Sequence, residues 1–378
     1  MLTSFDEKAM DFRHAVRDWL ATAIPDEWRS FGGHMQSPEA LRMRRDWDRR
    51  LYDGGYAGLT WPVEYGGRGL GVVEEAIFYE ECALAAAPEG LGRIGRGLAG
   101  PIMMAFGSEE QRARYLQPIL AGDEIWCEGL SEPEAGSDLA SLRTTARPGQ
   151  DGYRVSGSKI WTSYAHYAQY CLLLARTSDS APRHHNLGLF IVDMRDPGVS
   201  LSPIRQLTGE ADFNQTFLDD VPVAAAEVIG DASEGWKMVQ YGLRSGGQGP
   251  TNALLRYLEV RRQLARARQC ATECMSSDLT ELEWLQTRAE ILRIHILRVI
   301  EARASGLPEA GEAGIIKLVW SELEQQVMRF GFDLGCPVHE ADWRFAYFRS
   351  HSVTIAGGTS EIQRNIISTR ALSLPRSW

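Results

Sequence analysis

Cysteine and histidine, the side chains that most often bind metals or carry redox chemistry, are scattered in this sequence. No two cysteines form a C-x-x-C pair, the spacing typical of zinc and thiol-exchange sites. Cys270 and Cys274 lie one helical turn apart, but no histidine pair stands near them. His184 and His185 occupy a polar stretch that favours an exposed loop. We therefore expect no metal site and buried free thiols at Cys82, Cys127, Cys171, Cys270, Cys274 and Cys336.

Charge and composition exclude other broad classes of function. The formal net charge of −10 argues against nucleic acid as a partner. No G-x-G-x-x-G run follows an expected strand, so a Rossmann dinucleotide site is not expected. No run of 18 apolar residues is present and residues 1–7 are acidic, so we expect no membrane span and a cytoplasmic location. The lysines, which we interpret as scarce through coding bias, are Lys8, Lys159, Lys237 and Lys317.

The elements that would position a site change in type along the chain. Residues 1–120 show helical spacing, with capping boxes at 4–7 and 108–111 and a cap followed by proline at Ser37-Pro38. Short apolar runs between turn residues then predict strands at 125–130, 152–161, 170–174, 187–192 and 199–207. Helices are expected again near 234–276, 279–305, 310–336 and 359–371.

This order of elements predicts an α+β fold with three domains. We expect an N-terminal helical domain at 1–122, a middle β-barrel or sandwich at 123–230, and a C-terminal four-helix bundle at 231–378.

Three motifs in this order resemble those of the acyl-CoA dehydrogenase family. Residues 131–138 (SEPEAGSD) resemble its S/T-E-P-x-A-G-S-D signature, and residues 157–163 (GSKIWTS) resemble its G-x-K-x-W-I-T-N segment. Residues 357–365 (GGTSEIQRN) resemble its C-terminal G-T-x-x-I-Q motif, and residues 234–237 resemble the G-W start of its helical bundle. The resemblance covers nearly the whole chain. It implies an FAD-dependent oxidoreductase that performs the α,β-dehydrogenation of an acyl-CoA.

The residue types at these positions suit a flavin, whose ring has flat apolar faces and a hydrogen-bonding edge. By resemblance, Ser131 and Ser163 supply hydroxyls to that edge and Trp161 forms a wall beside the ring. Gly136 would let the backbone approach the ligand closely. The implied cofactor-binding residues are Leu130, Ser131, Gly136, Ser137, Trp161, Ser163, Thr359 and Glu361.

The sequence departs from the family at the catalytic base. The family reaction needs a carboxylate that removes the α-proton of the acyl thioester. Most members carry it directly before the G-T motif, where this chain has Gly357. A second subgroup carries it about ten residues after the G-W tryptophan, where counting reaches Gly246. Neither position holds a carboxylate, so the sequence assigns no catalytic residue.

A second departure concerns a partner chain. Many members carry an R-x-x-F-G motif whose arginine reaches the FAD pyrophosphate of a neighbouring subunit, and residues 267–282 here lack it. Some relatives without this arginine work in α2β2 assemblies, where a different chain supplies it. The resemblance therefore implies a homo- or hetero-oligomer with a second acyl-CoA dehydrogenase-like chain, and an electron-accepting flavoprotein.

Three interpretations stay open. The chain is an acyl-CoA dehydrogenase whose base lies elsewhere, a base-less subunit that supports a catalytic partner, or a flavin-dependent oxygenase on the same scaffold. All three are flavoproteins of one family. The glycine-rich residues 246–249 would either admit a bulky acyl group or simply kink a helix, so the acyl group is left open.

Overall fold

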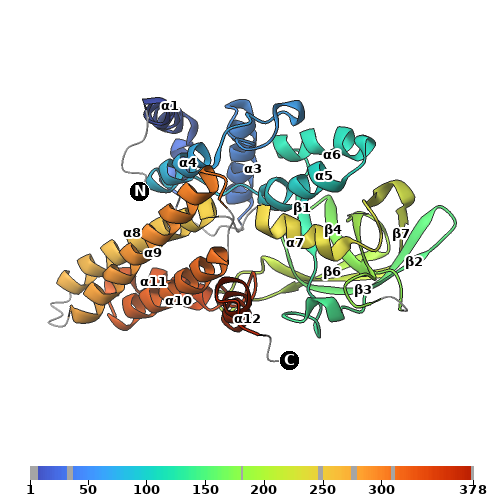
Figure 1. Ribbon diagram of the computed structural model, residues 1–378. Coiled ribbons are helices and arrows are strands. Elements are labelled where there is room, and N and C mark those ends of the chain that lie inside the picture. The colour runs from blue at the N-terminus through green and yellow to red at the C-terminus, as the bar shows by residue number, and fades with distance from the viewer. Residues whose placement is uncertain are drawn as a thin grey trace. The chain divides into compact units, whose positions relative to one another are not determined.

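The computed structural model describes residues 7–31, 37–179, 182–245, 250–273, 279–307 and 311–375. The chain forms two units, which are described separately (Figure 1). The sheet unit comprises Ala23–Gly69 and Pro88–Gly247, and the bundle unit comprises Met1–Thr22, Leu70–Ala87 and Gln248–Trp378. Within the described ranges, no helix is both long and apolar enough to cross a membrane.

One eight-stranded sheet organises the sheet unit. The strand order is β6-β7-β3-β2-β4-β5-β8, and β1 pairs with β4 in parallel. Strands β4 and β5 are buried on both faces, as their near-continuous apolar runs predict. The strands are β1 Trp126–Gly129, β2 Thr145–Pro148, β3 Gly152–Ser163, β4 Tyr170–Arg176, β5 Leu187–Asp193, β6 Val199–Ile204, β7 Phe213–Ala224 and β8 Val228–Ile229.

Two helices of the sheet unit, α3 (Pro38–Asp53) and α6 (Glu109–Ala121), begin where the sequence predicts caps. Ser37 Oγ accepts a hydrogen bond from Ala40 N at 3.1 Å, which starts α3. Ser108 Oγ accepts from Gln111 N at 3.2 Å, and the Gln111 side chain accepts from Ser108 N, so the expected capping box is confirmed. The helices of the sheet unit are α2 Asp26–Arg29, α3 Pro38–Asp53, α5 Gly100–Phe106, α6 Glu109–Ala121 and α7 Gly235–Ser245.

Long helices pack around a separate apolar core in the bundle unit. Helices α8, α9 and α10 lie side by side and bury side chains such as Tyr257, Leu292 and Val327 (Figure 1). The helices are α1 Glu7–Ala23, α4 Val72–Leu84, α8 Pro250–Glu273, α9 Thr280–Ala304, α10 Glu312–Asp333, α11 Glu340–Ser350 and α12 Ser360–Ile366, which continues as one π-helical turn, Ile367–Ala371.

The expected order of helices, sheet and helices is confirmed, but the predicted strands leave out β2, β7 and β8, and the predicted helices leave out α11. Strand β7 was missed because two of its inward positions, Asn214 and Thr216, are polar although both are buried. Helix α11 was missed as well. The helix expected over 234–276 is two helices, α7 and α8, and residues 246–249 between them lie outside the described part of the chain. The capping box expected at 4–7 also begins outside it.

Candidate functional site

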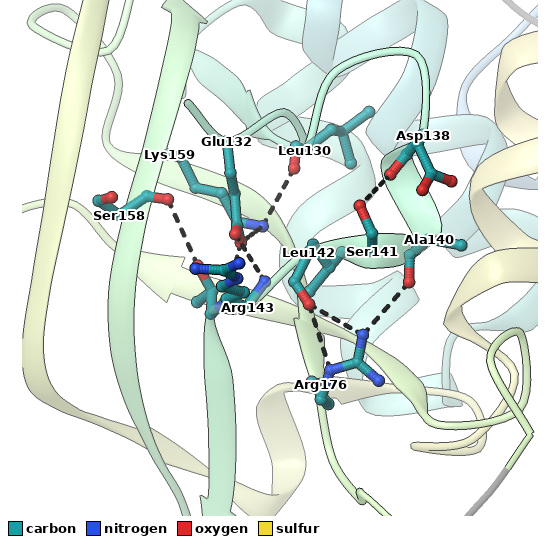
Figure 2. Close-up of polar contacts among 11 residues, drawn as sticks. Leu130, Glu132, Asp138, Ala140, Ser141, Leu142, Arg143, Ser158, Lys159 and Arg176 are labelled. Atoms are coloured by element: carbon teal, nitrogen blue, oxygen red, sulfur yellow. Dashed lines mark hydrogen bonds and ion pairs between the residues drawn. The ribbon is translucent and has the colours of Figure 1, made fainter. Parts of the chain in front are cut away.

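A buried ion pair fastens the signature loop, residues 131–138, to strand β3. The Glu132 carboxylate accepts hydrogen bonds from Lys159 Nζ at 2.9 Å and from the backbone N–H groups of Arg143 at 2.6 Å and Thr144 at 2.9 Å (Figure 2). Lys159 is 0% exposed and Glu132 is 7% exposed. Because these groups satisfy one another, they hold the loop in place rather than act on a ligand.

The same lysine reaches a residue that is expected to line the site. Lys159 Nζ also donates to the Leu130 carbonyl oxygen at 3.0 Å. The Lys159 ammonium therefore contacts both the residue that follows β1 and Glu132 in the signature loop. Burial acts to raise the pKa of Glu132, but the Lys159 ammonium and the N–H donors outweigh it and lower that pKa. Glu132 is therefore ionised and unsuited to accept a substrate proton at neutral pH.

The far end of the signature loop is fixed by two arginines. Arg176 donates to the carbonyl oxygens of Leu142 at 2.9 Å and Ala140 at 3.2 Å, just after the loop (Figure 2). Asp138 forms an ion pair with Arg183. The loop is thus held at both ends by side chains from neighbouring parts of the sheet unit.

Trp161 stands at an irregularity in β3. The pairing of β3 with β7 shifts register between Lys159 and Thr162, which is a β-bulge. Trp161 has a φ of 62° there, a left-handed conformation that costs a non-glycine residue about 1–3 kcal/mol. Its side chain is 53% exposed and packs edge-to-face on Phe213, with ring centroids 6.1 Å apart. The bulge therefore turns an indole ring toward solvent.

Backbone pairing brings two hydroxyl-bearing residues close to this bulge. Ile160 N donates to the Ser131 carbonyl oxygen at 2.9 Å, so the signature loop begins beside Trp161. Ser163 is the last residue of β3 and pairs with Phe213 of β7. The structure thus gathers Ser131, Trp161 and Ser163 at one end of the β3–β7 pair.

The middle of the signature loop is open. Gly136 and Ser137 are exposed, whereas Leu130 is half-buried. A Cβ built on Gly136 would meet no atom within 4 Å, so a ligand could approach this backbone closely. An exposed aromatic ring, nearby hydroxyls and an open glycine fit the faces and edge of a flavin.

Thr359 and Glu361 belong to the bundle unit and are described apart from the residues above. Thr359 caps α12, its Oγ1 accepting a hydrogen bond from a first-turn N–H at 3.2 Å, and Glu361 is exposed in that turn. The preceding Gly357 and Gly358 have φ of 68° and 92°. Lys317 Nζ donates to the Gly358 carbonyl oxygen at 2.7 Å, and burial lowers the pKa of Lys317 to about 8.

Of the two positions where the family carries its base, one can be inspected. Gly246 lies outside the described residues. Gly357 adopts a left-handed conformation that L side chains disfavour, so a glutamate would be strained there.

Glu128, the third residue of β1, was not singled out by sequence reasoning. Strand alternation places its side chain on the face of β1 that carries Trp126 and Leu130. The side chain is half-buried, and no hydrogen bond or ion pair to its carboxylate occurs among the described residues. Burial raises the pKa of Glu128, and the charge of Arg93 acts in the opposite direction. The sequence signal that could have identified Glu128 is that it is the one charged residue in the apolar run IWCEGL, residues 125–130.

Metal-binding geometry is not seen in the described part of the chain. No cluster of three or more His, Cys, Asp or Glu side chains there could hold a metal ion. Five cysteines are free thiols, of which Cys127, Cys171, Cys270 and Cys336 are buried as expected and Cys82 is only half-buried, and Cys274 lies outside the described residues. His184 and His185 are exposed, as expected, and the His184 ring lies 4.9 Å from that of Trp236.

Comparison with known proteins identifies the family. Three family models match successive parts of the chain: the acyl-CoA dehydrogenase N-terminal domain at 6–123, middle domain at 127–221 and C-terminal domain at 252–372. Acyl-CoA dehydrogenase IpdE1 of Mycobacterium tuberculosis is 38% identical over 382 residues, covering 97% of this chain and 98% of that protein. Acyl-CoA dehydrogenase FadE26 of the same species is 32% identical over 406 residues, covering all of both. This chain belongs to the acyl-CoA dehydrogenase family of flavoprotein oxidoreductases.

Solved structures show the same fold. The crystal structure of the ChsE4-ChsE5 complex from Mycobacterium tuberculosis contains a chain that superimposes with a TM-score of 0.84, at 29% identity and full coverage of both chains. A chain of the Tcur3481-Tcur3483 steroid ACAD superimposes with a TM-score of 0.83, at 26% identity and 99% coverage of both.

Proposed function

We propose that this chain binds FAD and, within an assembly that contains a second acyl-CoA dehydrogenase-like chain, performs the α,β-dehydrogenation of an acyl-CoA. The observation that carries the proposal is the exposed ring of Trp161 on a strained bulge beside Ser131 and Ser163. A strained, solvent-facing aromatic residue destabilises the free chain, and a flat apolar ligand would offset that cost. FAD, when bound, supplies the acceptor for the hydrogen that leaves the β-carbon.

The other residues have distinct proposed roles. Ser131 and Ser163 would offer hydrogen bonds to the ring edge, and Leu130 would contact its face. Gly136 and Ser137 would bind polar parts of the ligands through backbone and hydroxyl groups, because both are exposed in the open middle of the signature loop. From the bundle unit, Thr359 and Glu361 are proposed to contact FAD, as the resemblance implies.

A hetero-oligomer is the proposed assembly. Residues 267–282 contain no R-x-x-F-G motif, so the arginine that reaches a neighbouring FAD in many family members has to come from another chain. The solved relatives titled ChsE4-ChsE5 complex and Tcur3481-Tcur3483 steroid ACAD, each a pairing of two named chains, support this assignment. An electron-transferring flavoprotein is the proposed acceptor of the electrons.

The acyl group is proposed to be a bulky, ring-bearing one. The solved relative at 26% identity is titled a steroid ACAD, and glycines at 246, 247 and 249 leave side-chain volume free where a second family subgroup carries its base.

The alternative of a supporting, base-less subunit is favoured by one observation, the glycines at both family base positions. Anaerobic bleaching of the flavin in the purified assembly separates the two functions. We expect bleaching by ring-bearing acyl-CoAs and slower bleaching by straight-chain ones. An assembly that binds FAD yet is reduced by no acyl-CoA would contradict the dehydrogenase assignment.

The flavin site itself is tested with two tryptophan variants. Trp161→Ala should weaken FAD binding by about 2- to 12-fold, because an aromatic contact contributes about 0.5–1.5 kcal/mol. Trp284→Ala is the matched control, since Trp284 is also exposed (60%) but lies on α9 of the bundle unit. Equal FAD affinity in the two variants, measured by flavin fluorescence titration, would refute the site.

A further inference from the structure

We propose that Glu128 is the catalytic base that removes the α-proton of the acyl-CoA. The proposal rests on the dehydrogenase function proposed above and names the residue that both family positions leave unassigned. Glu128 lies on β1, two residues before Leu130 and three residues before Ser131.

Elimination among the carboxylates of β1 and the signature loop points to Glu128. Glu132 is saturated by Lys159 and two N–H groups. Glu134 forms a surface ion pair with Arg143 at 3.1 Å, and both side chains are largely exposed. Asp138 is paired with Arg183. The Glu128 carboxylate has no such partner in the described part of the chain, and its side chain is half-buried.

The geometry of β1 directs Glu128 to the side of Leu130. Residues 126, 128 and 130 project from one face of an extended chain, and residues two apart are about 7 Å apart along a strand. On this face Trp126 packs against Tyr170, with ring centroids 5.2 Å apart, and Glu128 lies opposite the buried Leu172 of β4. The carboxylate is therefore held by a strand among apolar neighbours, with Arg93 as the charged residue that acts on it, next to the residue expected to line the site.

Such surroundings suit a general base. An apolar environment disfavours the charged carboxylate, which increases its affinity for a proton. In the reaction, the α C–H bond breaks and its proton passes to Glu128 Oε. The electron pair of that bond forms the C=C bond as the β-hydrogen leaves with its own electron pair to FAD. The products are an enoyl-CoA, reduced FAD and protonated Glu128, which returns its proton to water.

The test measures proton exchange separately from flavin reduction. The assembly containing Glu128→Gln is incubated in D2O with an acyl-CoA that reduces the unmodified assembly, and deuterium at the α-carbon is followed by NMR. We expect exchange and flavin reduction to fall by about 10²- to 10⁴-fold with unchanged FAD content. Glu128→Asp, which keeps the carboxylate, should recover part of both rates.

Glu64→Gln is the matched control, because Glu64 is exposed in the short 3-10 turn Val63–Tyr65 of the same unit and lies outside the proposed site. A second readout needs no FAD. The raised pKa of Glu128 means that its ionisation destabilises the folded chain as pH rises through that pKa. Glu128→Gln should therefore raise Tm at pH 8 more than at pH 5, and Glu64→Gln should not.

Two results would overturn the assignment, and they are distinguishable. If the Glu128→Gln assembly exchanged the α-proton and reduced the flavin at the rates of the unmodified assembly, another group would be the base and the proposed function would stand. Failure of the unmodified assembly to be reduced by any acyl-CoA would overturn the proposed function and the base together.

Discussion

Replacing Lys159 by methionine would remove the cation on which the signature loop depends. Methionine keeps the length and apolar stem of lysine, so the substitution deletes the charge with little change in volume. It leaves Glu132 with two N–H donors but no counter-charge, and it leaves the Leu130 carbonyl oxygen without its donor. We expect a large loss of stability and, because the loop loses its fastening, a loss of FAD binding.

The magnitude follows from burial. Removing one partner of a buried ion pair costs about 3–5 kcal/mol, because the other charge stays out of water without compensation. Lys159 is 0% exposed and Glu132 7%, so this range applies here. The two remaining N–H bonds to Glu132 reduce the cost and the orphaned carbonyl adds about 1 kcal/mol, which leaves about 3–5 kcal/mol for Lys159→Met.

Urea unfolding at several pH values is the assay. In the unmodified chain the pKa of Glu132 is lowered, so its contribution is present above the ordinary carboxyl pKa and is lost as pH falls through the lowered one. In Lys159→Met the lysine charge no longer opposes the effect of burial, so we expect the pKa of Glu132 to rise and the variant to lose stability as pH rises. The difference between the two proteins should therefore be larger at pH 8 than at pH 5.

The chain provides its own control for this experiment. Lys237 pairs with Glu234 at 3.1 Å, but the two side chains are 63% and 44% exposed. Lys237→Met should therefore cost no more than about 1 kcal/mol. A Lys159→Met loss that did not exceed the Lys237→Met loss would refute the role assigned to the buried pair.

Three further outcomes are expected from equilibrium unfolding. Ser108→Ala should cost about 1 kcal/mol by removing the cap of α6, and an unchanged urea midpoint would contradict the capping box. Both Arg13 and Arg17 bind the buried Glu81, but the Arg13 side chain is 9% exposed and the Arg17 side chain is 52% exposed. Arg13→Met should therefore cost about 3 kcal/mol and Arg17→Met about 1 kcal/mol or less. Equal losses of stability in the two variants would contradict the stronger role of the buried arginine. Gly357→Ala should cost about 1 kcal/mol because φ is 68°, a loss that would be absent if the turn relaxed.

Much of the fold could be predicted because apolar periodicity and caps are local signals. The caps at Ser37 and Ser108 begin helices as expected, and the runs that became β4 and β5 are apolar enough to be recognised. Strand β7 was not predicted because its buried positions Asn214 and Thr216 carry polar side chains. The alternation of apolar and polar residues that indicates a strand is therefore interrupted at these two positions. Hydrophobicity reports burial only when the buried side chain is apolar.

The candidate site, like the fold, could be predicted from the sequence only in part. The motif residues Ser131, Trp161 and Ser163 could be selected from the sequence, but the bulge that exposes Trp161 depends on a register shift between β3 and β7. The importance of Glu128 depends on burial and on the partners taken by its neighbours, which no spacing reveals. The domain boundaries at 122/123 and 230/231, and the cytoplasmic location, stay predictions.

The scarcity of lysine makes the primary amines of this chain informative labels. Lys8 and Lys237 are exposed, whereas Lys159 is fully buried and Lys317 is 9% exposed. An amine-reactive reagent should therefore modify the first pair quickly, and it should reach Lys159 only when the β3 region opens transiently. Mass spectrometry of Lys159 acylation over time would thus measure the opening rate of the signature loop. Added FAD should slow that rate if the cofactor stabilises the closed form.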